Sequence, residues 1–130
     1  MEQLSKLDGV SILRGARVMV VEDDFIIAME LESVLADAGA EIVGLCRTVE
    51  DALDYADEEG LAAAVLDVRM GRDTSAPVAR RLMERGIPFI FYTGQVDTEF
   101  IRAEWPACRI LSKPAAPEMI VAAVAHLLEH

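Results

Sequence analysis

The stretch VMVVEDDF, residues 18–25, ends a run of four apolar residues with three adjacent acids. A short run that is apolar at every position is typical of a parallel strand covered on both faces. Adjacent acids repel one another and raise each other's pKa, so water, helix N-terminal amides or a bound cation must offset the repulsion. The stretch therefore predicts a buried strand that delivers negative charge to one edge of a sheet.

Four similar runs follow along the chain, and stretches with helical spacing separate most of them. The predicted strands are 16–22, 41–46, 61–68, 88–94 and 108–112, and the predicted helices lie within 23–40, 48–60, 75–86 and 116–130. The segment 95–107 has few apolar positions and contains Pro106, which indicates a short or irregular fourth helix. This alternation predicts an α/β fold in which helices cover both faces of a parallel sheet.

The composition bounds the function. The 130 residues favour one domain, and 53% of them are apolar, which is enough to fill a core. A net charge of −11 argues against nucleic acid or an anionic membrane as the main partner. No apolar run approaches the roughly 20 residues of a membrane span, and the first residues lack the pattern of a signal peptide. We therefore expect a cytoplasmic protein.

The remaining bulk features carry no site. Cys46 and Cys108 are too few for a disulfide framework or a cysteine-based zinc site, so we expect reduced, structural thiols. The chain ends in Leu-Glu-His, which could be the start of a vector-encoded tag, and His130 is given no role.

Chemically active side chains follow four of the five predicted strands. Glu22 and Asp23 end the first strand, Asp67 the third, Thr93 the fourth and Lys113 the fifth. In a doubly wound sheet the carboxyl ends of the strands meet at one edge, where binding sites form. Carboxylates from two strands make the oxygen site that Mg²⁺ prefers, and a cation there would offset the repulsion of the opening stretch.

This set of residues suits an aspartyl phosphate. Asp67 would be the carboxylate nucleophile, and Mg²⁺, Lys113 and the Thr93 hydroxyl would neutralise the phosphoryl oxygens. The sequence contains neither a GxxxxGK[ST] nor a GxGxxG motif, so nucleotide binding has no support. We therefore predict that Asp67, Thr93 and Lys113 carry the chemistry, with Mg²⁺ as the cofactor.

The motifs VMVVEDD, VLDVRM, FYTG and SKP together resemble the receiver domain of two-component response regulators, over about residues 15–128. The resemblance implies a flavodoxin-like (βα)₅ sandwich with strand order 2-1-3-4-5. It implies Asp67 as phospho-acceptor, Thr93 as switch hydroxyl, and Lys113 as phosphate ligand before Pro114, in a bond that is often cis. It also implies a Mg²⁺ site that is formed by Glu22, Asp23, Asp67 and the backbone carbonyl of Arg69. Asp24 is interpreted as a helix cap or a solvent-facing acid, with a metal role as the alternative.

The sequence departs from the receiver pattern at two places. Ile110 stands where many receivers carry an aromatic residue that moves with the switch hydroxyl, and Met70-Gly71 replaces the common Met-Pro, which predicts a flexible loop over 69–74. The run PFIFYTGQ resembles a stand-alone subgroup with an F-A-T-G type signature. We therefore expect an N-terminal extension over 1–14 and a single receiver domain over 15–130 without an output domain.

The predicted function is that of a phosphoprotein in a phosphorelay, not of an enzyme, although it would assist its own phosphorylation and dephosphorylation. A sensor histidine kinase or phosphotransfer protein would phosphorylate Asp67, and the phosphorylated form would bind an unknown downstream protein. Phe100, Trp105 and Ile110 are the candidates for that partner face, although the two aromatic residues are interpreted first as semi-buried packing residues and only second as partner contacts. A binding module that works unphosphorylated is the second hypothesis, and a phosphatase ranks last because no cap insertion is present. Homodimerisation, the kinase and the phosphoryl lifetime stay open.

Overall fold

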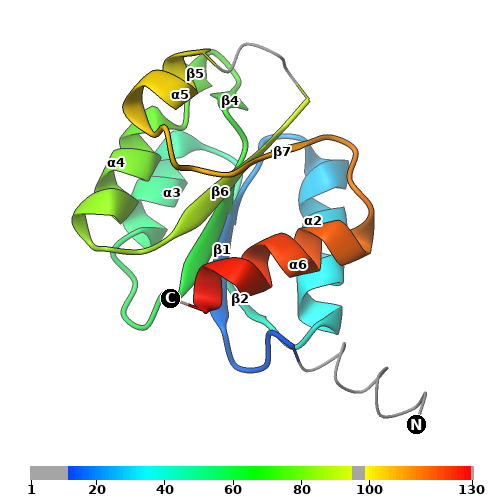
Figure 1. The fold of residues 1–130 in the computed structure, drawn as a ribbon. Helices are drawn as coiled ribbons and strands as arrows, with labels where there is room; N and C mark the ends of the chain where they lie inside the picture. The colour runs from blue at the N-terminus through cyan, green and yellow to red at the C-terminus, as the bar shows by residue number, and fades with distance from the viewer. Residues whose placement is uncertain (1–11, 95–98, 130) are drawn as a thin grey trace, which may run out of the picture.

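The computed structural model describes residues 12–94 and 99–129, so most of the predicted N-terminal extension and His130 lie outside the described residues. The described chain forms a five-stranded parallel sheet between two layers of helices (Figure 1). Its strands are β1 (Arg17–Val21), β2 (Glu41–Cys46), β3 (Ala63–Leu66), β6 (Phe89–Thr93) and β7 (Ile110–Ser112). The sheet order is β2-β1-β3-β6-β7. This is the order 2-1-3-4-5 of the core strands, and it confirms the predicted flavodoxin-like fold.

The helices divide between the two faces of the sheet. They are α2 (Phe25–Asp37), α3 (Val49–Tyr55), α4 (Ala76–Glu84), α5 (Glu99–Glu104) and α6 (Pro117–Leu128). One buried cluster packs α2 and α6 against the sheet, and a second packs α3, α4 and α5 against its other face (Figure 1). The six residues of α5 confirm the short fourth helix. Within the described ranges, no helix is both long and apolar enough to cross a membrane.

Strand β1 shows why the opening stretch is apolar at every position. Val18 and Val20 belong to the cluster beneath α2 and α6, whereas Met19 and Val21 belong to the cluster beneath α3 and α4. All four side chains are fully buried. Because successive strand residues point to opposite faces, a strand with helices on both sides must be apolar throughout.

The segment after β3 contains a short hairpin, whereas the flexibility expected of residues 69–74 stays a prediction. Two short strands, β4 (Arg69–Met70) and β5 (Asp73–Thr74), pair antiparallel across a two-residue turn. Gly71 has a φ of +67°, and no non-glycine residue in the described part of the chain has a positive φ. A positive φ confined to the first turn residue is the mark of a type II′ turn, which suits the twist of a hairpin. Gly71 therefore suits the first position of the turn between β4 and β5.

Asp24 caps α2, as one of its interpretations predicted. Its carboxylate accepts hydrogen bonds from the Ile26 and Ile27 N–H groups at 3.0 and 3.1 Å. We expect Asp24→Ala to lower the free energy of unfolding by about 1 kcal/mol, because two helix-start donors lose their acceptor. Asp24→Asn is the control, since asparagine caps as well as aspartate but lacks the charge that repels the neighbouring acids. Urea denaturation of both variants measures the difference, and equal stabilities would contradict a capping role.

Candidate functional site

Three carboxylates meet at the carboxyl ends of β1 and β3. Val21 pairs with Leu66 at the end of the two strands, and the Asp67 N–H extends the ladder by donating to the Val21 carbonyl at 2.8 Å. This register places Glu22 and Asp67 side by side. Ligand atoms of Glu22, Asp23 and Asp67 lie within 4.8 Å of one another. The parallel sheet therefore brings together acids that lie far apart in sequence.

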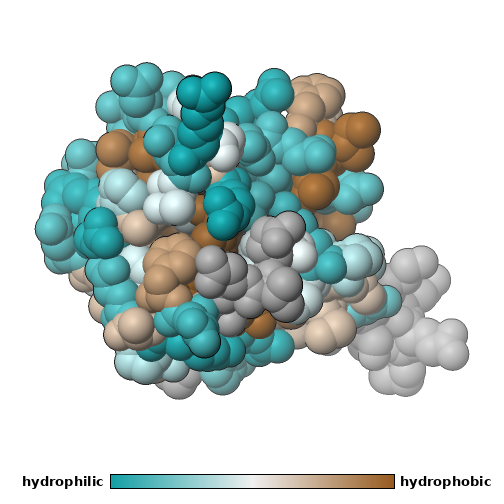
Figure 2. All heavy atoms as spheres, turned by 90° about the horizontal axis from the view of Figure 1, so that it is seen from above, coloured by the Kyte–Doolittle hydropathy of each residue, from teal (hydrophilic) through white to brown (hydrophobic). Residues whose placement is uncertain are grey.

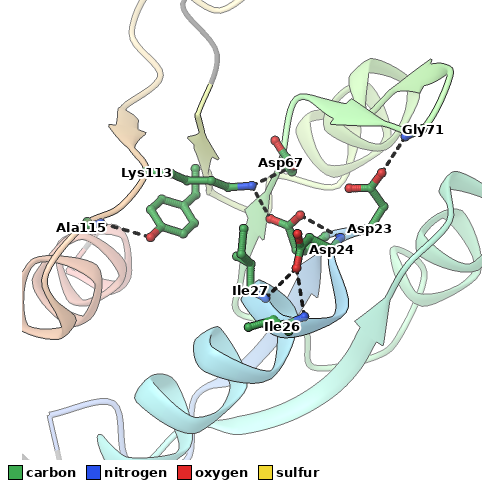
Figure 3. A network of polar contacts seen from close by, with 10 residues as sticks. Asp23, Asp24, Ile26, Ile27, Asp67, Gly71, Lys113 and Ala115 are labelled. Carbon is green, nitrogen blue, oxygen red and sulfur yellow. Dashed lines mark hydrogen bonds and ion pairs between the residues drawn. The ribbon is translucent and has the colours of Figure 1, made fainter.

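Lys113, which follows β7, supplies the opposite charge to this cluster. Its Nζ lies 2.7 Å from Glu22 Oε1 and 3.0 Å from Asp67 Oδ2 (Figure 3). The side chains of Glu22, Asp67 and Lys113 are only 1%, 9% and 14% exposed, so water screens these contacts poorly. The structure thus assembles a compact network of charges at the edge of the sheet.

The environment shifts the pKa of two members of this network. Burial raises the pKa of Glu22 to about 7, against the opposing effect of its hydrogen bond to Lys113. Burial alone would lower the pKa of Lys113, but its hydrogen bonds to Glu22 and Asp67 outweigh burial and raise that pKa. The lysine therefore stays charged at neutral pH and holds the acids together.

A cavity of about 260 Å³ opens above the network. Asp23, Asp67, Arg69, Gly71, Thr93, Gly94 and Lys113 line it. Thr93 is buried at the end of β6, and its carbonyl accepts a hydrogen bond from the Lys113 N–H at 3.0 Å. The cavity thus unites the predicted acceptor, hydroxyl and ammonium, together with the residue whose backbone carbonyl was predicted as a metal ligand.

The donor set fits the Mg²⁺ site that is typical of receivers. Its three carboxylates offer only oxygen ligands, which a hard cation prefers. Glu22 Oε2 also accepts a hydrogen bond from the Asp24 N–H at 3.1 Å, and Glu22 is almost fully buried. Asp23 and Asp67 both line the cavity, so these two residues are the best placed to contact a cation there. The role of the Arg69 carbonyl stays a prediction.

The three residues of the predicted partner face do not share one surface. Phe100 is 39% exposed, but Trp105 is only 5% exposed. The indole centroid of Trp105 lies 6.3 Å from the ring of Phe89 and 5.6 Å from that of Phe91. Ile110 is partly buried and packs against the core cluster that contains Phe89, Phe91 and Trp105. The burial of Trp105 agrees with its interpretation as a packing residue and not with a place on the partner face, because β6 presents two aromatic rings that cover the indole.

Tyr92 lies in the FYTG run, and the sequence pattern predicts no role for it. Its hydroxyl accepts a hydrogen bond from the Ala115 N–H at 3.1 Å, and its ring centroid lies 5.7 Å from Lys113 Nζ. The Lys113–Pro114 peptide bond between these contacts is cis, as the resemblance implied. Tyr92 therefore fixes the segment that carries the lysine, and only the tertiary structure reveals this contact.

Three apolar side chains at the start of α2 are exposed, next in sequence to the acidic cluster that Glu22, Asp23 and Asp67 form. Phe25, Ile26 and Met29 are 55%, 68% and 44% exposed, and the Arg47 guanidinium lies 5.3 Å from the Phe25 ring centroid. Figure 2, seen from above, shows hydrophobic side chains gathered at the upper right, where the start of α2 lies. The exposed Phe25, Ile26 and Met29 thus form an apolar surface at the start of α2, beside the exposed acids Asp24 and Glu30.

Comparison with known proteins identifies relatives of this chain. Residues 18–125 match the family described as the response regulator receiver domain. The chain is 28% identical over 118 residues to the phyllosphere-induced regulator PhyR of Methylorubrum extorquens, and these residues cover 88% of this chain but 44% of that protein. The structure of PhyR from Brucella abortus is 28% identical, with a TM-score of 0.78 over 98% of this chain and 54% of that chain.

A second solved structure shares the fold over nearly its whole length. A response regulator receiver protein from Sinorhizobium medicae has a TM-score of 0.79 at 24% identity, and the match covers 90% of this chain and 97% of that chain. The chain therefore spans about half the length of the PhyR proteins and nearly the full length of the chain in the Sinorhizobium medicae structure.

Proposed function

We propose, because this chain belongs to the response regulator receiver family, that it accepts a phosphoryl group on Asp67 from a histidine kinase or phosphotransfer protein. Receivers are phospho-acceptors in two-component signalling and not classic enzymes. The observation that carries the proposal is the placement of Asp67 in an open cavity, 3.0 Å from the Lys113 ammonium and within the acidic cluster.

Each side chain of the cavity has a role in the proposed transfer. Asp67 Oδ2 is held by Lys113 at 3.0 Å, which leaves Oδ1 to attack phosphorus. The new bond joins Asp67 to phosphorus, the phosphorus–nitrogen bond of the donor phosphohistidine breaks, and its electron pair stays on the imidazole. Lys113 and the Thr93 hydroxyl would contact the phosphoryl oxygens. Mg²⁺, when bound, would supply the positive charge that brings two anionic groups together.

The donor must reach the cavity beside α2. The exposed Phe25, Ile26 and Met29 border that approach and offer an apolar contact for the donor protein. After transfer, rearrangement near Thr93 would change the affinity for a downstream protein. Signalling without an attached output domain stays a prediction, as does the partner itself.

A binding module that works unphosphorylated is the second candidate. Ile110, which takes the place of a movable aromatic residue, is partly buried against the aromatic cluster of β6 and Trp105. Because Ile110 is not aromatic and is held by this packing, phosphorylation cannot act here by moving an aromatic side chain. This observation favours a partner surface that does not depend on Asp67.

Incubation of the protein with acetyl phosphate and Mg²⁺ tests the proposal. We expect intact mass spectrometry to show a gain of one phosphoryl mass, because the cavity offers the acceptor and the charges that stabilise the product. Omission of Mg²⁺ should remove the gain. A beryllofluoride titration is the companion experiment, since some receivers accept phosphate only from a kinase. Absence of both the adduct and the beryllofluoride complex would contradict phosphorylation and favour the second candidate.

A further inference from the structure

One backbone N–H joins the β4–β5 hairpin to the acidic cluster. The Gly71 N–H donates to Asp23 Oδ2 at 2.8 Å, across 48 positions of sequence. Figure 3 shows the Asp23 carboxylate pointing toward Gly71 and away from Lys113. The contact therefore connects the end of β1 to a separate two-stranded sheet.

The geometry of the turn makes this donor available. Gly71 is the first of two turn residues, and ladder hydrogen bonds in such a hairpin are made by the paired strand residues on either side. Its φ of +67° is a conformation that proline cannot adopt. A proline here, as in the common Met-Pro sequence, would also lack the N–H. The contact thus requires a residue other than proline at this position, and the positive φ favours glycine.

A carboxylate that is bound on one side is better prepared to bind a cation on the other. The hydrogen bond is short and charge-assisted, so it restricts the rotation of the Asp23 side chain. Asp23 also belongs to the cluster whose ligand atoms lie within 4.8 Å, and both Asp23 and Gly71 line the cavity. Donors that contact a metal ligand orient it and tune its affinity.

We propose that Gly71 is a positioning residue of the metal site, and that its N–H makes the β4–β5 hairpin part of that site. This inference rests on Mg²⁺ binding in the proposed function. The N–H holds Asp23 Oδ2 and leaves the other carboxylate oxygen available, so that Asp23 would be one of the residues that hold the cation. By linkage, a cation that binds the oriented carboxylate also stabilises the hairpin.

A matched pair of semisynthetic proteins isolates the N–H. Gly71→D-Ala and Gly71→D-Pro both suit a positive φ, but only the first retains the donor. Met70 lies in β4 and is extended, as a residue before proline should be. Chemical ligation at the chain's own Cys46 and Cys108 provides both full-length proteins without a further change.

We expect isothermal titration with Mg²⁺ to show about tenfold weaker binding for Gly71→D-Pro than for Gly71→D-Ala. The D-Ala protein should bind like the wild type. Equal affinities for the pair would overturn the inference and leave the proposed function intact. Failure of the wild type to bind Mg²⁺ at all would instead overturn the metal site, and the inference with it.

A measurement on the unmodified protein covers the case in which a variant does not fold. We expect the Gly71 amide proton to exchange with solvent about tenfold more slowly when saturating Mg²⁺ is present, because the cation stabilises the hairpin contact. Amides in β2, on the far side of β1 from the hairpin, are the internal reference. Mg²⁺ binding without slower exchange at Gly71 would overturn the coupling.

Discussion

Asp67→Ala is expected to abolish the acetyl phosphate adduct completely. The substitution removes the only carboxylate that both lines the cavity and contacts Lys113 among the described residues. Lys113 keeps Glu22 as a partner at 2.7 Å, so the charge network loses one member without leaving the ammonium unpaired. The variant should therefore stay folded, which near-ultraviolet circular dichroism can verify, while intact mass spectrometry shows no phosphoryl gain.

Asp73→Ala is the matched control for this loss. Asp73 is an exposed acid in β5, close in sequence to Asp67 but outside the cluster of three carboxylates. Its removal should leave both the rate and the extent of adduct formation unchanged. An adduct that persists in Asp67→Ala would place the acceptor elsewhere. Once a downstream partner is known, Asp67→Ala can be tested for binding to it. Partner binding that Asp67→Ala leaves unchanged would favour the unphosphorylated binding module.

Lys113→Ala is expected to damage both stability and phosphorylation. It removes the ammonium that lies 2.7 Å from Glu22 and 3.0 Å from Asp67, and Glu22 is almost fully buried. Leaving one partner of a buried ion pair alone costs roughly 3 kcal/mol of the free energy of unfolding. Loss of a group that contacts the phosphoryl oxygens should slow adduct formation by about 100-fold.

Lys113→Arg separates these two effects. The guanidinium keeps the positive charge, so stability measured by urea denaturation should recover most of the loss. Its planar fork does not reproduce the point charge of an ammonium, so the adduct should still form slowly. Added Mg²⁺ should stabilise Lys113→Ala more than the wild type, because a cation among the acids replaces part of the missing charge. Wild-type stability in Lys113→Ala without Mg²⁺ would contradict the role of the ion pair.

Much of the candidate site could be predicted because parallel strands end at a common edge. The apolar run of β1 and the acids behind it were sufficient to place Glu22 and Asp23 there, and the same reasoning applied to Asp67, Thr93 and Lys113. The helix cap at Asp24 follows from local chemistry, since its acceptors and donors lie within three residues. Thr48 is a similar case, with its hydroxyl accepting from the Asp51 N–H at 3.1 Å.

The contacts that sequence reasoning missed are those between distant segments. The β4–β5 hairpin has strands of two residues, which are too short for any periodic signal. Trp105 could be read as a partner residue or as a packing residue until β6 placed Phe89 and Phe91 around it. The tether from Tyr92 to Ala115 and the bond from Gly71 to Asp23 depend on how loops approach the sheet.

The sequence by itself determined the α/β class, the sheet edge that carries the site and the types of residue that meet there. Hydrophobic periodicity and helix caps encode these features over a few neighbouring residues, which is why they can be read without coordinates. Only the tertiary structure decided that Lys113 pairs with both Glu22 and Asp67, that Trp105 is buried and that Gly71 holds Asp23. These features depend on packing and hydrogen bonds between residues far apart in the chain, for which local pattern carries no signal.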